Sequence, residues 1–365
     1  MKIMNLEQFF EQSLKWKKAV DEMNSSILPD CTIPSFKEFE SYETNIDLRD
    51  DLRRYNEINT INQKYLRNNE LPYLNMGDTP LISLIIGPTG CGKSQLLRNI
   101  IGYKKLSPPP ESVIFITPSK GMLSQDELLL WKTQLQEGNY SFNENIYPTT
   151  NVFKVDFIEL SFDEAITPEN IDPNNEKSVF SVCCKKGPTC VILDECMQKL
   201  IQKGNISPLF CSLPSKLYSK FCNAFYMFVV LHNVNPISGN GNNIMDLKSQ
   251  TRLHILSTKN QPLQISNFVH NRSGGMNSII RTVLINSIIS EKNSNFSFVM
   301  FNTCPKRESF QWSAILDGGR EIIPLCVNLQ SLMLNSVVKI CNVCVNKIKN
   351  QKKYQKDKRR KIQQQ

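Results

Sequence analysis

The sequence predicts an α/β fold with a mostly parallel central sheet flanked by helices. Short, unbroken apolar runs recur along the chain, as in strands that are buried on both faces. The first run, Leu81–Ile86, lies between Pro80 and Gly87. An amphipathic stretch at helical spacing, Lys93–Ile101, separates it from the second run at Val113–Ile116. Strands that alternate with helices in this way form βαβ units, whose strands lie parallel in one sheet.

The composition of the 365-residue chain is that of an ordinary globular protein, with 40% hydrophobic and 21% charged residues. The longest apolar run, Ala224–Leu231, is far shorter than the roughly 20 residues that span a bilayer. The polar start of the chain predicts that there is no signal peptide, so the 12 cysteines are expected to be free thiols. Only three histidines are present, which disfavours a His-rich metal site.

Residues 1–78 are polar and predict a helical N-terminal region. Apolar residues recur every three or four positions from Leu48 to Tyr65, which is typical of one face of a helix. This helix is expected to pack on the chain's own core or to dock on a neighbouring subunit.

Residues 79–330 are expected to form the core around the sheet. Later apolar runs predict further buried strands at Cys190–Leu193, Phe225–Leu231 and Leu253–Leu256. The interval 134–187, rich in Asn and Pro, instead favours irregular structure inserted between strands.

The pattern becomes mixed after residue 262. It predicts a helix at Ser278–Ile289 and strands at Phe296–Phe301 and Glu321–Val327. A final helix is expected from about Leu329, and residues 331–365 form a C-terminal helix with a basic tail.

The segment Gly87-Pro88-Thr89-Gly90-Cys91-Gly92-Lys93-Ser94 fits the phosphate-binding pattern G-x-x-x-x-G-K-[ST]. Glycines allow the backbone to turn successive N–H groups onto phosphate oxygens, and the helix that follows directs its positive end to the same place. Lys93 is expected to bridge the β- and γ-phosphates of ATP, and the Ser94 hydroxyl to ligate Mg²⁺. The sheet is therefore expected to be that of a P-loop NTPase.

The buried run before Asp194 and Glu195 predicts the second half of this site. Asp194 is expected to hold the Mg²⁺ shell, and Glu195 to polarise a water for in-line attack on the γ-phosphate. A water-activating glutamate favours an ATPase over a phosphotransferase. A nucleotide kinase would also carry an Arg-rich lid, whereas residues 134–187 contain no Arg.

The strand Phe225–Leu231 ends in two polar residues that are candidates to sense the γ-phosphate. Asn233 is the first candidate and joins the predicted catalytic set, His232 is the second, and an ordinary exit from the strand is the alternative. Three arginines are candidate fingers for a neighbouring subunit, with solvated surface side chains as the alternative. They are Arg252, Arg272 and Arg281.

Cys341 and Cys344 have the C-x-x-C spacing of zinc and redox sites. Both lie on the apolar face of the predicted final helix, and the sequence has no second such pair nearby. Buried, inert thiols are therefore expected.

The formal net charge of +9 is concentrated at the C-terminus. Residues 347–361 contain nine Lys and Arg against Asp357 alone, a net charge of +8, so the other 350 residues sum to +1. This segment is expected to contact the phosphate backbone of DNA, to serve as a nuclear localisation cluster at Lys356–Lys361, or both. The alternative is a soluble helix end.

Several segments together resemble the adenovirus genome-packaging ATPases of the packaging protein 1 family. The first is the phosphate-binding loop with its sequel, residues 87–99. The others are Pro109–Glu111, Phe115–Pro118, Glu137–Tyr140, Asp194–Met197, Pro214–Leu217, Val230–Pro236 and Asn328–Ser331. The resemblance covers roughly residues 80–350, and the first 75 residues match less clearly.

This resemblance implies a viral protein of the host nucleus and the virion that binds the packaging sequence of double-stranded DNA. With other viral packaging proteins, and as a homo-oligomer, it would use ATP hydrolysis to move that DNA into a preformed capsid. It would also bind the late promoter and activate late viral transcription. The resemblance assigns the nucleotide and metal roles to Lys93, Ser94, Asp194 and Glu195. The alternative is a DNA-binding transcription regulator that uses ATP as a switch ligand without translocation.

Overall fold

The structure is a computed structural model. It describes residues 3–23, 28–41, 48–67, 73–75, 77–136, 139–142, 145–148, 155–204, 206–233, 242–274, 276–291 and 297–363. Contacts within the chain divide it into two units. We call them the helical unit (Met1–Glu70, Val269–Ser287 and Cys326–Gln365) and the sheet unit (Leu71–Phe268 and Ile288–Leu325). Among the described residues, no helix is long and apolar enough to cross a membrane.

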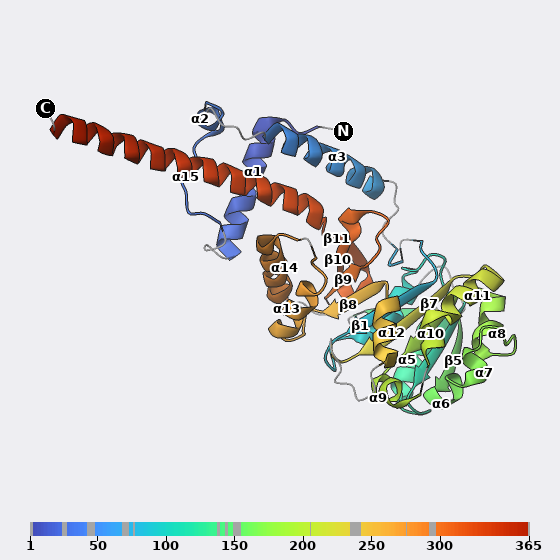
Figure 1. Ribbon diagram of the computed structural model, residues 1–365. Coiled ribbons are helices and arrows are strands. Elements are labelled where there is room, and N and C mark those ends of the chain that lie inside the picture. The colour runs from blue at the N-terminus through green and yellow to red at the C-terminus, as the bar shows by residue number, and fades with distance from the viewer. Residues whose placement is uncertain are drawn as a thin grey trace. The chain divides into compact units, whose positions relative to one another are not determined.

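The sheet unit is built on a nine-stranded sheet in the order β11-β10-β9-β8-β1-β7-β6-β2-β5 (Figure 1). The strands from β8 to β5 in this order are parallel, and β9, β10 and β11 extend the sheet in antiparallel fashion. The strands are β1 (Leu81–Ile86), β2 (Ser112–Thr117), β5 (Asp156–Ser161), β6 (Thr189–Leu193), β7 (Phe225–Leu231), β8 (Leu253–Ser257), β9 (Phe298–Asn302), β10 (Trp312–Leu316) and β11 (Glu321–Pro324). The predicted α/β class with a mostly parallel sheet is therefore confirmed.

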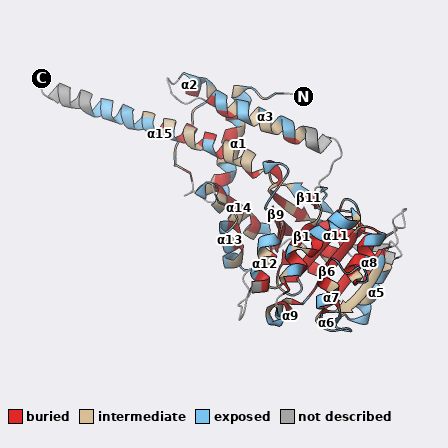
Figure 2. Cartoon of the chain, turned by 45° about the vertical axis from the view of Figure 1, so that its right-hand side comes forward, coloured by how far each residue is buried: buried red, intermediate tan, exposed pale blue. Residues whose placement is uncertain are grey.

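Helices cover this sheet, and Figure 2 shows its central strands as buried. Every residue of β1, β2, β6, β7 and β8 is buried, which explains why these strands appear in the sequence as unbroken apolar runs. The helices of this unit are α4 (Lys93–Gly102), α5 (Gln125–Gln136), α6 (Phe162–Ala165), α7 (Pro168–Ile171), α8 (Val179–Lys186), α9 (Met197–Gln202), α10 (Ser207–Cys211), α11 (Leu213–Phe221) and α12 (Asn242–Gln250). A separate hairpin pairs β3 (Asn139–Phe142) with β4 (Asn145–Pro148).

One expectation about this unit is wrong, and one expected strand is shorter than predicted. The interval 134–187 is not simply an irregular insertion, because it contributes β5, which pairs with β2 at the edge of the main sheet. The strand expected over Glu321–Val327 ends at Pro324, and Val327 already begins a helix. An edge strand packs less of its surface than a central one, and the residues of β5 are accordingly half-buried or exposed. For this reason β5 lacks the unbroken apolar run that is typical of the central strands.

The helical unit contains α1 (Leu6–Met23), α2 (Phe36–Glu40), α3 (Leu48–Arg67), most of α14 (Ser278–Ser290) and α15 (Val327–Gln363), while α13 (Pro262–His270) spans the boundary between the units. The helix expected over Leu48–Tyr65 is confirmed as α3. It packs on α1 and α15, where the Asp51 carboxylate accepts hydrogen bonds from the Lys339 ammonium at 2.6 Å and the Ser336 hydroxyl at 3.0 Å. These contacts place α3 on the chain's own core.

All twelve cysteines lie among the described residues and all are free thiols. Cys341 and Cys344 are buried in α15, as expected, and burial together with the neighbouring Cys31 raises the pKa of the Cys341 thiol to about 12. Within the described part of the chain, no group of three or more His, Cys, Asp and Glu side chains could hold a metal ion. The burial of both cysteines and the raised pKa of the Cys341 thiol fit inert thiols.

Candidate nucleotide-binding site

The predicted phosphate-binding segment forms the loop between β1 and α4. A Cβ atom on Gly87 would lie 2.6 Å from the Cys91 sulfur and 2.8 Å from Ser257 Cβ, so only glycine fits there. Gly90 and Gly92 adopt φ angles of 75° and 92°, a left-handed conformation that is unfavourable for residues with a Cβ atom. The glycines of the motif are thus required by the backbone path of this loop.

Lys93 opens α4 and returns its side chain to the loop. Its ammonium donates hydrogen bonds to the carbonyl oxygens of Gly87 and Pro88, both at 2.9 Å. Lys93 is also buried, so its positive charge lies at the loop and away from bulk water. A buried cation beside a glycine-rich loop at a helix N-terminus fits a polyphosphate ligand.

Asp194 follows β6 directly and lies beside the start of α4. The Ser94 hydroxyl is 3.4 Å from Asp194 Oδ2, although the two residues are 100 positions apart in the sequence. Burial raises the pKa of Asp194 to about 6; the charge of Glu195 adds to this rise and that of Lys93 opposes it. A hydroxyl and a carboxylate at this separation are the oxygen donors that Mg²⁺ prefers, so the pair fits the predicted metal.

Glu195 adopts a left-handed backbone conformation with a φ of 56°, and its side chain is 47% exposed. Its Oε2 lies 2.5 Å from Nε2 of His232, the first residue after β7. Because β7 lies between β1 and β6 in the sheet, this contact brings the carboxylate from the end of β6 across the end of β7 toward the phosphate-binding loop.

Asn233 occupies a different position from its neighbour. It is exposed, and its Oδ1 accepts a hydrogen bond from Gln264 Nε2 of α13 at 3.5 Å. The sequence ranks Asn233 before His232, whereas the structure brings His232 and not Asn233 to the predicted catalytic glutamate. The rest of the motif after it, Val234–Pro236, and Glu137–Gly138 lie outside the described residues.

The three candidate arginine fingers are dispersed. Arg252 precedes β8 at the opposite end of the sheet from the loop. It forms an ion pair with the Asp78 carboxylate at 2.8 Å and donates a hydrogen bond to the Cys304 carbonyl at 2.6 Å. Arg281 belongs to the helical unit and donates to the carbonyl oxygen of Met276 at 3.2 Å. Arg272 belongs to the same unit, and burial lowers its pKa to about 10.

Residues that the sequence reasoning missed support α4 from outside the motif. The Arg98 guanidinium pairs with Glu127 of α5 at 3.3 Å and lies 5.6 Å from the centre of the Trp131 ring. On the other side, Asn99 Nδ2 donates to the Gly318 carbonyl at 2.8 Å. The available signals were Arg98 and Asn99 directly beside the apolar residues of an amphipathic helix, and the Gly318-Gly319 pair in the turn before β11.

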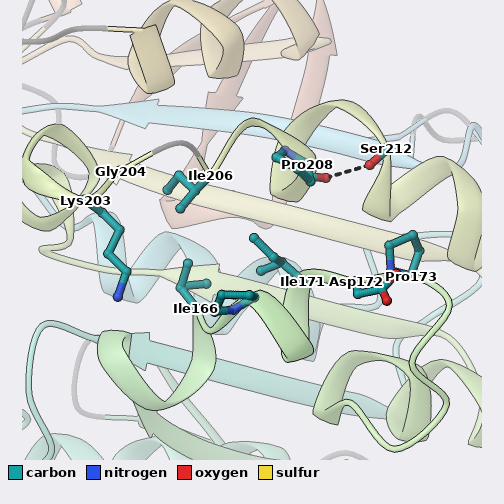
Figure 3. A pocket seen from close by; sticks show the side chains of 10 residues that line it. Ile166, Ile171, Asp172, Pro173, Lys203, Gly204, Ile206, Pro208 and Ser212 are labelled. Atoms are coloured by element: carbon teal, nitrogen blue, oxygen red, sulfur yellow. Dashed lines mark hydrogen bonds between the residues drawn. The ribbon is translucent and has the colours of Figure 1, made fainter.

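A separate pocket of about 590 Å³ lies in the sheet unit, as Figure 3 shows. Ten residues line it: Ile166, Pro168, Ile171, Asp172, Pro173, Lys203, Gly204, Ile206, Pro208 and Ser212. Its polar groups already have partners, since Lys203 pairs with Asp163 at 3.7 Å and the Ser212 hydroxyl donates to the Pro208 carbonyl at 3.2 Å. The other charged residue, Asp172, accepts a hydrogen bond from the Asn174 N–H at 2.9 Å. Because both charged side chains are already paired and the rest of the lining is mostly apolar, the loop region is the stronger catalytic candidate.

Comparison with known proteins identifies the family. The family model described as adenovirus IVa2 protein matches residues 2–363. The chain belongs to the adenovirus IVa2 protein family. Among curated relatives, packaging protein 1 of snake adenovirus serotype 1 is 37% identical over 358 residues, which cover 96% of this chain and 80% of that protein. Packaging protein 1 of fowl adenovirus A serotype 1 is 35% identical over 342 residues, covering 91% and 76%.

Solved structures give a more distant likeness. The genome packaging NTPase B204 of Sulfolobus turreted icosahedral virus 2, in complex with ATP-gammaS, aligns with a TM-score of 0.37 at 14% identity. The alignment covers 65% of this IVa2 family chain and 97% of that one.

Proposed function

We propose that this IVa2 family member is an ATP hydrolase that drives the packaging of viral double-stranded DNA into preformed capsids. The observation that carries the proposal is the convergence of Ser94 and Asp194 beside the phosphate-binding loop, with Glu195 as the next residue. The name packaging protein 1, carried by the curated relatives, supports the packaging role.

The proposed reaction uses side chains that already lie at the loop. Lys93 and the loop N–H groups bind the β- and γ-phosphates of ATP, while Ser94 and Asp194 would hold Mg²⁺. When bound, Mg²⁺ supplies charge neutralisation of the polyphosphate. Glu195 accepts a proton from the attacking water. The water oxygen then bonds to the γ-phosphorus as the bond to the β–γ bridging oxygen breaks, which yields ADP and phosphate.

The proposed polyanion contact belongs to the end of α15. Between Lys349 and Lys356 every residue is exposed, and four of the eight are lysines. We assign to this end of the helix a contact with the DNA phosphate backbone, both at the packaging sequence and at the late promoter. The side chains of residues 357–361, which complete the proposed nuclear localisation cluster, lie outside the described residues.

The wider proposal follows the family resemblance. The protein would act in the host nucleus and in the virion, as a homo-oligomer with other viral packaging proteins and the capsid. It would also activate late viral transcription. The alternative is a transcription regulator that binds ATP as a switch ligand without hydrolysing it.

Phosphate release from ATP by the full chain, with and without double-stranded DNA, tests the proposal. We expect Lys93→Ala to lower turnover by about a hundredfold or more, because it removes the cation at the phosphates. Lys132→Ala, at an exposed position on α5, is the matched control and should leave turnover unchanged. ATP binding without turnover in any condition would favour the switch ligand instead.

A further inference from the structure

Glu195 needs help to point at a nucleotide. It is the second residue after β6, about half of its side chain is exposed, and an unrestrained exposed glutamate populates several rotamers. A general base must lie within hydrogen-bond reach of the water it deprotonates. Something therefore has to fix the carboxylate, and the contact of its Oε2 with His232 Nε2 at 2.5 Å does so.

His232 is itself tied to the phosphate-binding loop. β7 pairs with β1 in parallel up to Leu231 opposite Ile86, and the next N–H, that of Gly87, donates to the Leu231 carbonyl at 3.1 Å. The backbone directly before His232 is thus bonded to the first residue of the loop. The imidazole is only 26% exposed, which further limits its movement. A shift of the loop would therefore move the imidazole that holds Glu195.

The backbone of Glu195 also contributes to this direction. Its φ of 56° lies in the left-handed region, which is uncommon for a residue with a side chain. The turn is held by the Glu195 N–H, which donates to Asp194 Oδ1 at 3.1 Å. Strain of this kind persists where surrounding contacts impose it, often at functional sites.

We propose that His232 is a positioning residue that holds the Glu195 carboxylate over the phosphate-binding loop. An ionised carboxylate only accepts hydrogen bonds, so His232 donates its Nε2–H to Oε2. Oε1 stays available to accept the proton of the attacking water. The proposal rests on the proposed hydrolase function and differs from a role as a γ-phosphate sensor, because His232 acts through Glu195 and not on the nucleotide.

Three consequences separate this role from a merely structural one. His232→Ala should lower kcat for ATP about 10- to 100-fold and leave nucleotide affinity unchanged, since the imidazole does not contact the phosphates. His232→Gln, whose amide nitrogen can donate to the same oxygen, should restore part of the rate. In a Glu195→Gln background, removal of His232 should cost nothing more, because the two side chains act as one unit.

The experiment is a double-mutant cycle over His232 and Glu195. It measures single-turnover hydrolysis and the affinity for a non-hydrolysable ATP analogue, with His270→Ala as the control at an exposed histidine of the helical unit. A His232→Ala chain with wild-type kcat, an effect on affinity alone, or a further full loss in the Glu195→Gln background would each overturn the positioning role. Absence of turnover in the wild-type chain would instead overturn the hydrolase proposal on which it rests.

Discussion

The sheet unit and the helical unit carry their polar groups in opposite ways. In the sheet unit, charged side chains such as Lys93 and Asp194 are buried at strand and helix ends and lie within a few ångströms of their partners. In the helical unit, the densest charge of the chain lies on an exposed stretch of α15. Catalysis of a bond-breaking reaction requires a few groups in fixed positions, whereas attraction to a polyanion requires only many charges of one sign.

The helix α15 shows this difference within one element. Its first half packs on α1 and α3, with Ile340 and Cys341 fully buried, so the apolar face is used for stability. From Lys349 to Lys356 the residues are exposed, and four of these eight are lysines. The charged end is therefore free of the constraints that fold the unit, and it can be removed without opening the core.

The largest effect is expected at the loop of the sheet unit. Gly87→Ala places a Cβ atom 2.6 Å from the Cys91 sulfur and 2.8 Å from Ser257 Cβ, so the loop must shift. We expect ATP affinity to fall by about a hundredfold or more, measured by titration calorimetry, because the backbone N–H groups no longer converge on the phosphates. Gly204→Ala is the control, since its added Cβ meets open space. Equal ATP affinities in the two variants would show that the nucleotide does not bind at this loop.

The burial of the Asp194 carboxylate is expected to lower the stability of the sheet unit at neutral pH. Burial raises the pKa of the folded carboxyl from 3.8 to about 6, so the folded state binds the proton more tightly than the unfolded state. The protonated Asp194 carboxyl therefore stabilises the folded state below about pH 4, and this stabilisation is lost as the pH rises through 6. A pKa shift of two units corresponds to a loss of about 3 kcal/mol in the free energy of unfolding.

Asp194→Asn should therefore raise the free energy of unfolding at pH 7 by up to about 3 kcal/mol in buffer without metal or nucleotide. Chemical denaturation at pH 4 and pH 7 measures it, with Asp126→Asn at an exposed position as the control. A variant less stable than the wild type at pH 7 would show that the carboxylate is not under strain from burial.

A smaller effect is expected in the helical unit. Asp51→Ala removes the acceptor of the Lys339 ammonium and the Ser336 hydroxyl, and we expect about 1–2 kcal/mol of lost stability. Hydrogen exchange should show faster opening of α3 and α15, with β1 and β7 unchanged. The exposed Asp50→Ala is the control on the same helix turn. Faster exchange throughout the sheet unit would mean that the two units unfold together.

The sequence predicted most of the sheet because central parallel strands leave a direct trace in it. The runs at Leu81–Ile86 and Phe225–Leu231 match β1 and β7 at both ends. By contrast, β5 and β10 were missed, since edge or antiparallel strands alternate or mix polar residues. The order of strands in the sheet is not written in any local pattern.

The same limit applies to the candidate site. The motif predicted the loop and the acidic pair, because their chemistry depends on residues that are neighbours in the sequence. The contact between His232 and Glu195 depends on β7 lying next to β6, which is a property of the sheet. The support of α4 by Arg98 and Asn99 likewise depends on tertiary packing.

The central claim is that ATP hydrolysis belongs to the sheet unit and attraction to DNA to the end of α15. The salt dependence of double-stranded DNA binding by a chain that ends at Asn346 tests this claim most directly. This truncation removes nine basic residues and leaves the phosphate-binding loop intact. The slope of log K against log salt is negative, and we expect its magnitude to decrease by about 0.9 for each DNA phosphate that the removed side chains neutralise. ATP turnover without DNA should stay at the wild-type rate. An unchanged slope would contradict the assignment of DNA attraction to the end of α15.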